Sequence, residues 1–255
     1  MSATDPSNPP ATRRRALLAA FLALAASCGS TRVAVPDAPP TRTEHTMSRE
    51  VDGRRLSYLL DVPTGEAPRR GRPLVLFLHG IGERGDDLAR VAVHGPPKLA
   101  PTMPELWGCV LVSPQCPDDT WWPTETLVAL VEEVCDTCEV DRDRVYVTGL
   151  SMGGFGTWEL LATHPDLFAA AAPICGGMRE DRESAIVAAK DVPIRVFHGA
   201  DDRLVPVEMS ERLVERLRDA GADVELTVYE GVGHDAWTRT YSDPELWTWM
   251  FAQER

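Results

Sequence analysis

The segment that decides the fold is RVYVTGLSMGG at residues 144–154. Its first five residues are typical of a buried strand, and the apolar residues of Met152–Thr163 recur three and four apart, as in a helix. Between them, Gly149 and Gly153 frame Ser151 in a G-x-S-x-G motif. Glycines remove side chains that would collide in a sharp strand-to-helix turn, and such a turn exposes a serine for nucleophilic attack. We therefore predict that Ser151 is a nucleophile; the alternative is a glycine turn that only lets a helix approach a strand.

Strands and helices alternate on both sides of this segment. Short apolar runs predict further strands at Pro73–Leu78, Gly108–Ser113, Ala169–Ile174, Ile194–His198 and Val224–Tyr229, and helical spacing predicts helices at Glu125–Val134, Val207–Ala220 and Pro244–Ala252. Asp52-Gly53 predicts a tight turn between two antiparallel strands before them. This order predicts an α/β fold with a mostly parallel sheet of about eight strands, flanked by helices on both faces. Only a short segment separates the runs ending at Ile174 and beginning at Ile194, so we expect no large lid.

A serine hydroxyl needs a histidine base, itself oriented by a carboxylate, to act as a nucleophile at neutral pH. Asp202 and His234 each follow a predicted strand, and the chain order Ser151, Asp202, His234 is one that such triads use. Asp201 is the alternative acid, although we expect it to cap the following helix. We expect His198 to support the acid loop through a hydrogen bond; the alternative is that it is the base.

The segment His79–Asp87 follows a predicted strand and resembles the His-Gly oxyanion loop that α/β-hydrolases carry at this position, which makes it the candidate oxyanion loop. Acyl transfer passes through an oxyanion that preorganised backbone N–H groups stabilise. We predict that the amides of Ile81 and Met152 are these donors. His79 is expected to shape the loop and to transfer no proton.

Three tryptophans, Trp121, Trp122 and Trp237, are candidates for the substrate-binding cleft, where they could stack on a sugar or an aromatic acyl group. The alternative for each is ordinary packing.

The N-terminal residues are typical of an export signal. Arg13, Arg14 and Arg15 precede an apolar stretch over Ala16–Ala26, which is too short to span a bilayer. We expect residues 1–27 to be a signal peptide, residues 28–46 a flexible tether, and residues 47–255 the catalytic domain. Ala25-Ala26-Ser27-Cys28 resembles a bacterial lipobox. Lipidation of Cys28, which would tether the protein to a membrane, ordinary cleavage and an uncleaved anchor all stay open.

Charge and cysteine content exclude several functions. The chain has 26 basic and 39 acidic residues, a net charge of −13, and this sign repels nucleic acid. Among six cysteines, Cys135 and Cys138 have C-x-x-C spacing, but no second pair completes a zinc site and no strand precedes them, as redox motifs require. We predict two ordinary cysteines at a helix end, free or bridged.

Together these motifs resemble those of a known superfamily. The likeness rests on His79–Asp87, Ser113–Pro117 with Trp121-Trp122, Gly149–Gly154, His198–Pro206 and Gly231–Trp237. Residues 47–255 resemble the α/β-hydrolases, and within them a bacterial group of predicted peptidases and phospholipase/carboxylesterase-like proteins. That group is related to dienelactone hydrolases and to feruloyl and acetylxylan esterases. Dienelactone hydrolases proper use a cysteine nucleophile, and this chain departs from them with Ser151.

The resemblance implies an exported serine carboxylesterase, periplasmic, on the cell surface or secreted, that needs no cofactor and no metal. Its expected substrates are small-molecule esters or acetyl and feruloyl esters carried by polysaccharides. A serine peptidase acting on small peptides and a non-catalytic binding protein on the same scaffold are the alternatives. The sequence makes no prediction of oligomeric state.

Overall fold

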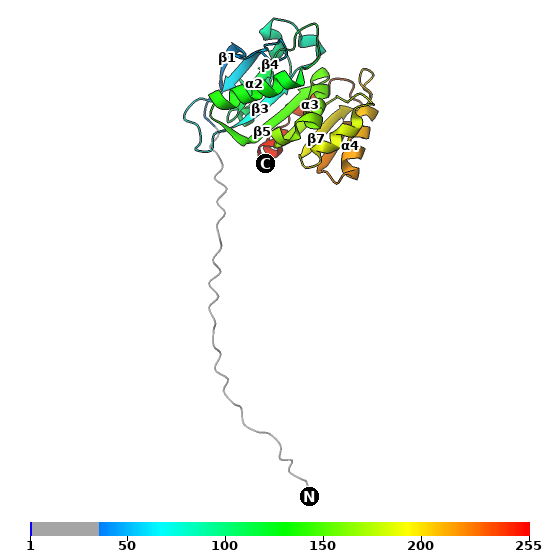
Figure 1. Ribbon diagram of the computed structural model, residues 1–255. Helices are drawn as coiled ribbons and strands as arrows, with labels where there is room; N and C mark the ends of the chain where they lie inside the picture. Colours follow the sequence, from blue (N-terminus) through cyan, green and yellow to red (C-terminus); the bar gives the residue numbers. More distant parts are fainter. Residues whose placement is uncertain (2–35) are drawn as a thin grey trace. The chain divides into compact units, whose positions relative to one another are not determined.

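The computed structural model describes Met1 and residues 36–255, and residues 36–255 all belong to one compact unit. Its centre is an eight-stranded sheet in the order β1-β2-β4-β3-β5-β6-β7-β8 (Figure 1). The strands are β1 (Thr41–Thr46), β2 (Ser57–Val62), β3 (Arg72–Leu78), β4 (Val110–Pro114), β5 (Val140–Leu150), β6 (Ala170–Ile174), β7 (Ile194–Gly199) and β8 (Val224–Tyr229). The pairs β1–β2 and β2–β4 are antiparallel, and all other pairs are parallel. The predicted fold class is therefore confirmed.

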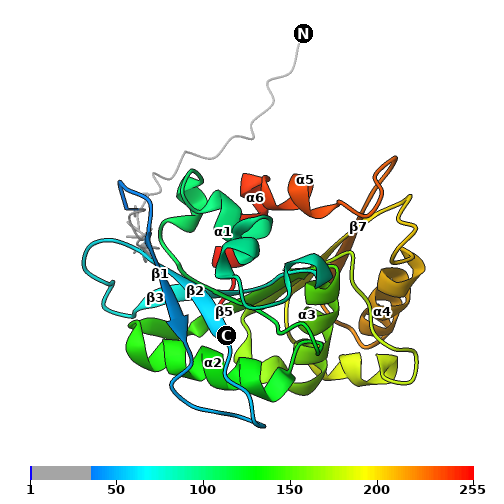
Figure 2. The ribbon, with the colours of Figure 1, turned by 90° about the horizontal axis from the view of Figure 1, so that it is seen from above.

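Helices cover both faces of the sheet. One face carries α2 (Thr124–Thr137), α3 (Met152–Thr163) and α4 (Glu208–Asp219), and the other carries α1 (Gly95–Leu99), α5 (Trp237–Tyr241) and α6 (Pro244–Phe251) (Figure 2). A separate cluster of buried apolar side chains fills the space between the sheet and each helical layer. Short 3₁₀ helices are η1 (Ile81–Glu83), η2 (Leu88–Ala92), η3 (Pro104–Leu106), η4 (Pro165–Leu167) and η5 (Glu183–Ala189). The sequence did not predict α1, α5 or η1 to η4, because each is too short to show a helical period.

The first strand corrects the predicted tether. We expected residues 28–46 to be flexible, but Thr41–Thr46 forms the edge strand β1, paired along its whole length with β2. Its side chains are mostly exposed and polar, so the strand lacks the apolar pattern that sequence reasoning depends on. Backbone pairing holds it, together with Arg42, whose Nε donates to the buried carboxylate of Asp61 at 2.9 Å.

The predicted tight turn is present next to this pair. Asp52 and Gly53 have φ values of 53° and 73°, and Val51 and Arg54 on either side pair through their backbones at 2.9 Å. Positive φ at both central residues is what a type I′ hairpin turn requires.

The targeting predictions concern residues outside the described part of the chain. The signal peptide of residues 1–27 and Cys28 belong to this undescribed part. Among the helices of the described residues, none has both the length and the apolar character needed to cross a bilayer. Cys135 and Cys138 are both free thiols in this structure.

Candidate active site

Ser151 occupies a strained turn between β5 and α3. Its backbone has φ 53° and ψ −117°, a conformation that non-glycine residues rarely adopt. The turn is compact because its glycines have no Cβ. A Cβ on Gly149 would overlap the carbonyl of Gly153, and a Cβ on Gly153 would overlap the carbonyl of Leu78 at the end of β3. The G-x-S-x-G spacing therefore lets the chain place the Ser151 hydroxyl at the N-terminus of α3, beside the carboxyl end of the sheet.

The three predicted triad residues are joined by hydrogen bonds. His234 Nε2 lies 2.8 Å from Ser151 Oγ, and His234 Nδ1 lies 2.7 Å from Asp202 Oδ2. A neutral imidazole that donates from Nδ1 to the carboxylate has its lone pair on Nε2, where it can accept the serine proton. The loops after β5, β7 and β8, which are separated in sequence, thus bring a nucleophile, an acid and a base together.

Asp202, and not its neighbour, faces the histidine. Its Oδ1 accepts the amides of Leu204 at 2.9 Å and Val205 at 3.0 Å, which leaves Oδ2 for His234. Burial raises the pKa of Asp202, but the hydrogen bonds from His234 and the two amides outweigh it and hold the pKa below its usual value. Asp201 is exposed, and the helix that we expected it to cap begins after Val207 without a side-chain cap. That capping prediction is wrong, because the helix begins only at Glu208, with Val207 and not Asp201 at its N-cap position.

His198 supports the acid loop, as the sequence predicted. Its ring is fully buried, with Nε2 donating to the carbonyl of Val205 at 2.9 Å and Nδ1 lying 2.8 Å from Ser210 Oγ. Burial lowers the pKa of His198, which favours the neutral ring. Its Nε2 also lies 3.4 Å from Asp202 Oδ2. It contacts the acid and not Ser151, so the geometry favours His234 as the base.

The predicted oxyanion loop lies directly beside the nucleophile. A Cβ built on Gly80 would stand 3.7 Å from the Cβ of Ser151. Ile81 is the first residue of η1 and Met152 the first of α3, and N–H groups at these positions have no acceptor within their own helices. Both amides are therefore available next to the serine hydroxyl.

His79 shapes this loop and stays neutral. Its Nε2 accepts the amide of Cys116 at 3.0 Å, so its Nδ1 carries the proton and donates to the carbonyl of Gly80 at 2.6 Å. Burial lowers the pKa of His79 to about 4. Both nitrogens are occupied by backbone groups, in keeping with the expected structural role.

The three candidate tryptophans have different environments. Trp121 is 55% exposed and packs edge to face with Phe155, with ring centroids 5.8 Å apart. Trp122 is only 7% exposed, and its Nε1 donates to the carbonyl of His79 at 3.3 Å. Trp237 is half-buried and packs edge to face with His234 at 5.3 Å. The prediction that Trp122 lines the cleft is wrong, because its ring packs under the oxyanion loop.

Cys175 is a neighbour of the triad that sequence reasoning missed. It follows β6 with φ 39°, and its Sγ, a carboxylate oxygen of Asp202 and a ring nitrogen of His234 all lie within 4.8 Å of one another. Within the described residues this is the cluster whose ligand types and spacing could hold a metal ion. Burial raises the pKa of the Cys175 thiol, and Asp202 and His234 already bond to each other, so the arrangement is that of a triad beside a neutral thiol. One feature of the sequence could have indicated this position: Cys175 directly follows β6, and β6 lies in the sheet between β5 and β7, the strands that precede Ser151 and Asp202.

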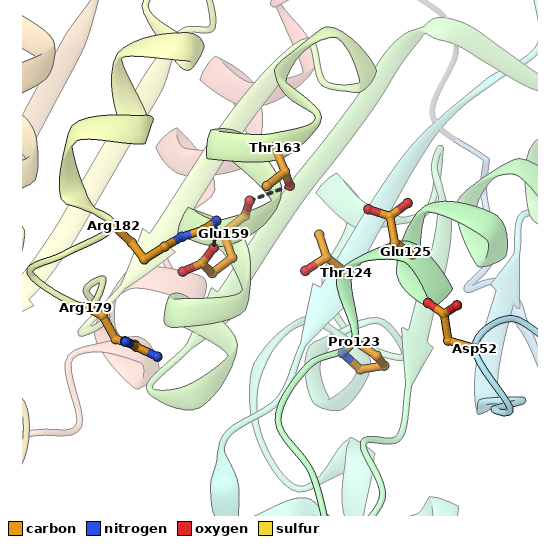
Figure 3. A pocket seen from close by; sticks show the side chains of 8 residues that line it. All are labelled: Asp52, Pro123, Thr124, Glu125, Glu159, Thr163, Arg179 and Arg182. Atoms are coloured by element: carbon orange, nitrogen blue, oxygen red, sulfur yellow. Dashed lines mark hydrogen bonds and ion pairs between the residues drawn. The ribbon is translucent and has the colours of Figure 1, made fainter.

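A pocket of about 450 Å³ lies elsewhere on the molecule. It is lined by Asp52, by Glu125 of α2, by Glu159 of α3, and by Arg179 and Arg182 before η5 (Figure 3). Arg182 donates to Glu159 at 2.8 Å across it. None of the triad residues lines this pocket, and the chemistry of the triad gives the better candidate site.

Comparisons with known proteins agree with this geometry. Residues 120–245 match the Dienelactone hydrolase family, and this range contains the whole triad. A curated relative from Nocardia uniformis subsp. tsuyamanensis, named "Putative esterase NocK", is 31% identical over 231 residues, covering 77% of this chain and 66% of the relative. A bifunctional acetylxylan esterase/xylanase from Neocallimastix patriciarum is 27% identical and covers 62% of this chain and 23% of that protein.

Solved structures give the same picture. A thermostable esterase superposes with a TM-score of 0.74 at 35% identity, covering 84% of this chain and 63% of the other. A ferulic acid esterase superposes with a TM-score of 0.65 at 19% identity, covering 85% of this chain and 100% of the other, and this likeness concerns the fold alone. The chain spans less than two thirds of the nocardial relative and of the thermostable esterase.

Proposed function

We propose that the chain, which has the α/β-hydrolase fold and matches the Dienelactone hydrolase family over residues 120–245, is a serine carboxylesterase. The observation that carries the proposal is the continuous hydrogen-bonded series from Ser151 through His234 to Asp202. A binding protein on the same scaffold would not need a serine in a strained turn bonded to a histidine and a buried carboxylate.

In the first half of the reaction, Ser151 Oγ attacks the carbonyl carbon of the ester while His234 Nε2 takes the hydroxyl proton. The Asp202 carboxylate stabilises the resulting imidazolium through Nδ1. The negative charge that develops on the carbonyl oxygen is stabilised by the amides of Ile81 and Met152. The intermediate then collapses to an acyl-enzyme, and His234 returns its proton to the leaving alcohol.

In the second half, water replaces the alcohol. His234 Nε2 accepts a proton from water as its oxygen attacks the acyl carbon, and the same two amides hold the oxyanion. Collapse of this intermediate breaks the bond to Ser151 Oγ, which regains a proton from His234. The products are a carboxylic acid and the free enzyme.

The proposed substrates are small esters and acyl esters carried by polysaccharides. The site lies at the carboxyl ends of the parallel strands, and only Cys175–Pro193 separates β6 from β7, so no large lid encloses it. An open site suits esters on polymers better than long-chain lipids, which need an enclosed apolar pocket.

A panel of p-nitrophenyl esters of increasing acyl length tests the activity, with the Ser151→Ala variant as control. We expect hydrolysis of the acetyl and butyryl esters by the wild type and none above background by the variant. A folded wild-type protein that is inert on the panel would contradict the proposal. Cleavage of p-nitroanilides at rates matching the esters of the same acyl group would favour the peptidase alternative.

We also propose that the protein is exported through residues 1–27 and anchored through a lipid on Cys28. The support is the basic and apolar composition of that segment and the Ala25–Cys28 lipobox-like sequence. The full chain and its Cys28→Ala variant, expressed in a bacterium fed an alkyne-tagged fatty acid, test this. Label on the wild type alone is expected. Cleaved but unlabelled wild type would overturn the lipid anchor, and an uncleaved chain retained in the cytoplasm would overturn export.

A further inference from the structure

An exposed aromatic side chain lies at the rim of the candidate site. Trp121, between β4 and α2, packs edge to face with Phe155 at an interplanar angle of 79°. Phe155 lies one turn after Ser151 on α3, and its N–H donates to the carbonyl of Ser151 at 3.0 Å. Helical side chains lean toward the N-terminus of their helix, so the Phe155 ring covers the turn that begins at the nucleophile. Trp121 is therefore next to the reacting centre.

The segment that carries Trp121 is fixed to the oxyanion loop on both sides. Arg84 Nη1 donates to the carbonyl of Thr120 at 3.2 Å, and Trp122 Nε1 donates to that of His79. The Trp122 ring also packs so closely on α3 that a Cβ on Gly156 would lie 2.8 Å from it. A rigid aromatic side chain binds a ligand with little loss of conformational entropy.

The exposure of Trp121 indicates the kind of ligand. In an edge-to-face pair Phe155 covers at most one face of the indole, and 55% of Trp121 stays exposed. A pyranose ring has an apolar face of C–H groups and a rim of hydroxyls, so it can stack on an indole while its hydroxyls stay in water. An aromatic acyl group, by contrast, gains most from a site that encloses it.

The charge of the protein restricts the kind of polysaccharide that could bind. The whole chain carries a net charge of −13, although beside Trp121 the acidic Asp119 is paired with Arg54 at 3.4 Å. The net negative charge of the whole protein disfavours association with polymers of uronic acids.

We propose that Trp121, supported by Phe155, binds a sugar ring of a neutral, ester-bearing polysaccharide and so presents the ester to Ser151. This inference rests on the proposed esterase activity and adds the residue that binds the polymer and the kind of polymer that it binds. The ring of Trp121 pairs with Phe155 and not with His234, so Trp121 sets specificity and leaves the chemical steps to Ser151, His234 and Asp202.

The test compares kcat/KM on acetylated glucomannan, a neutral polymer, with kcat/KM on p-nitrophenyl acetate. We expect Trp121→Ala to lower the value on the polymer roughly tenfold, the scale of one lost aromatic stacking contact with its buried area, and to change the small ester less than twofold. Trp121→Tyr, which keeps an aromatic face, should recover most of the polymer activity. Val187→Ala, which shortens another exposed apolar side chain on η5, should change neither.

Equal losses on both substrates would show that Trp121 only braces the loop, and an unchanged polymer rate would show that it binds no sugar. Methyl ferulate serves as a third substrate, and a loss of activity confined to it would assign Trp121 to the binding of an aromatic acyl group. Each of these results overturns the proposal.

A binding measurement separates failure of this inference from failure of the esterase proposal. In affinity electrophoresis through glucomannan, the inactive Ser151→Ala protein should be retarded, and the Ser151→Ala/Trp121→Ala protein should migrate freely. Retardation of both proteins, or of neither, would contradict sugar binding by Trp121 whatever the catalytic result.

Discussion

Replacing Asp202 by asparagine should almost stop ester hydrolysis and leave the fold intact. In the wild type Oδ1 accepts the amides of Leu204 and Val205, and Oδ2 accepts the proton of His234 Nδ1. An asparagine oxygen can keep both amide bonds, so its NH₂ group then faces His234. An NH₂ group can only donate, so it selects the imidazole tautomer with its proton on Nε2. That tautomer cannot accept the proton of Ser151.

The magnitude follows from the loss of the correct tautomer and of the charge that stabilises the imidazolium. We expect kcat to fall by about 10⁴-fold, which corresponds to roughly 5 kcal/mol of transition-state stabilisation. KM should change little, because the buried Asp202 carboxylate is covered by His234 and by its own turn and does not face the substrate.

Steady-state kinetics on p-nitrophenyl acetate, with circular dichroism to check folding, measure this effect. Asp201→Asn is the matched control, since Asp201 is the adjacent acid, is exposed, and should keep full activity. The reasoning is refuted if the two variants lose activity equally, or if Asp202→Asn stays folded and within tenfold of the wild type.

Three further predictions concern the support of the site. Gly153→Ala should prevent folding of the turn or cost several kcal/mol of stability, because the added Cβ would overlap the Leu78 carbonyl. Gly82→Ala is the control: an added Cβ there would have no atom within 4 Å, so this variant should keep the wild-type melting temperature. In the folded protein the pKa of His79 is about 4, below its usual value of 6.5. As the pH falls from 6.5 to 4, His79 is therefore protonated in the unfolded chain before it is protonated in the folded protein. The free energy of unfolding should fall by up to about 3 kcal/mol over this range. Denaturant titrations at several pH values should show a smaller fall in His79→Asn. Trp122→Phe removes the hydrogen bond to the His79 carbonyl and should lower kcat on p-nitrophenyl acetate by about three- to tenfold with KM unchanged, and an unaltered kcat would contradict a role in holding the oxyanion loop.

The sequence predicts well those parts of the structure whose conformation depends on a few neighbouring residues. The strand, turn and helix around Ser151 could be predicted because the sharp strand-to-helix turn requires glycines at positions 149 and 153. Asp202 and His234 could be predicted because each directly follows a predicted strand. The two acids at 201 and 202 share one loop, and only the course of that loop decides which of them reaches His234.

The parts that sequence missed depend on tertiary contacts. β1 has a polar, exposed pattern, because an edge strand is held by backbone pairing. Trp121 and Trp122 are adjacent and identical in type, yet one is exposed and the other lies under the oxyanion loop, since only the second meets the His79 carbonyl. The closeness of Cys175 to the triad arises from the order of the strands in the sheet, which no local pattern contains.

The central claim is that Ser151 forms a covalent intermediate through the triad. The most direct measurement is intact-mass spectrometry of the purified protein after incubation with a fluorophosphonate, which phosphonylates activated serines, followed by peptide mapping. We predict a single adduct on Ser151 in the wild type and in Asp201→Asn, a much slower adduct in Asp202→Asn, and none in Ser151→Ala. A folded wild-type protein without an adduct, or one that carries it on another residue, would contradict the account.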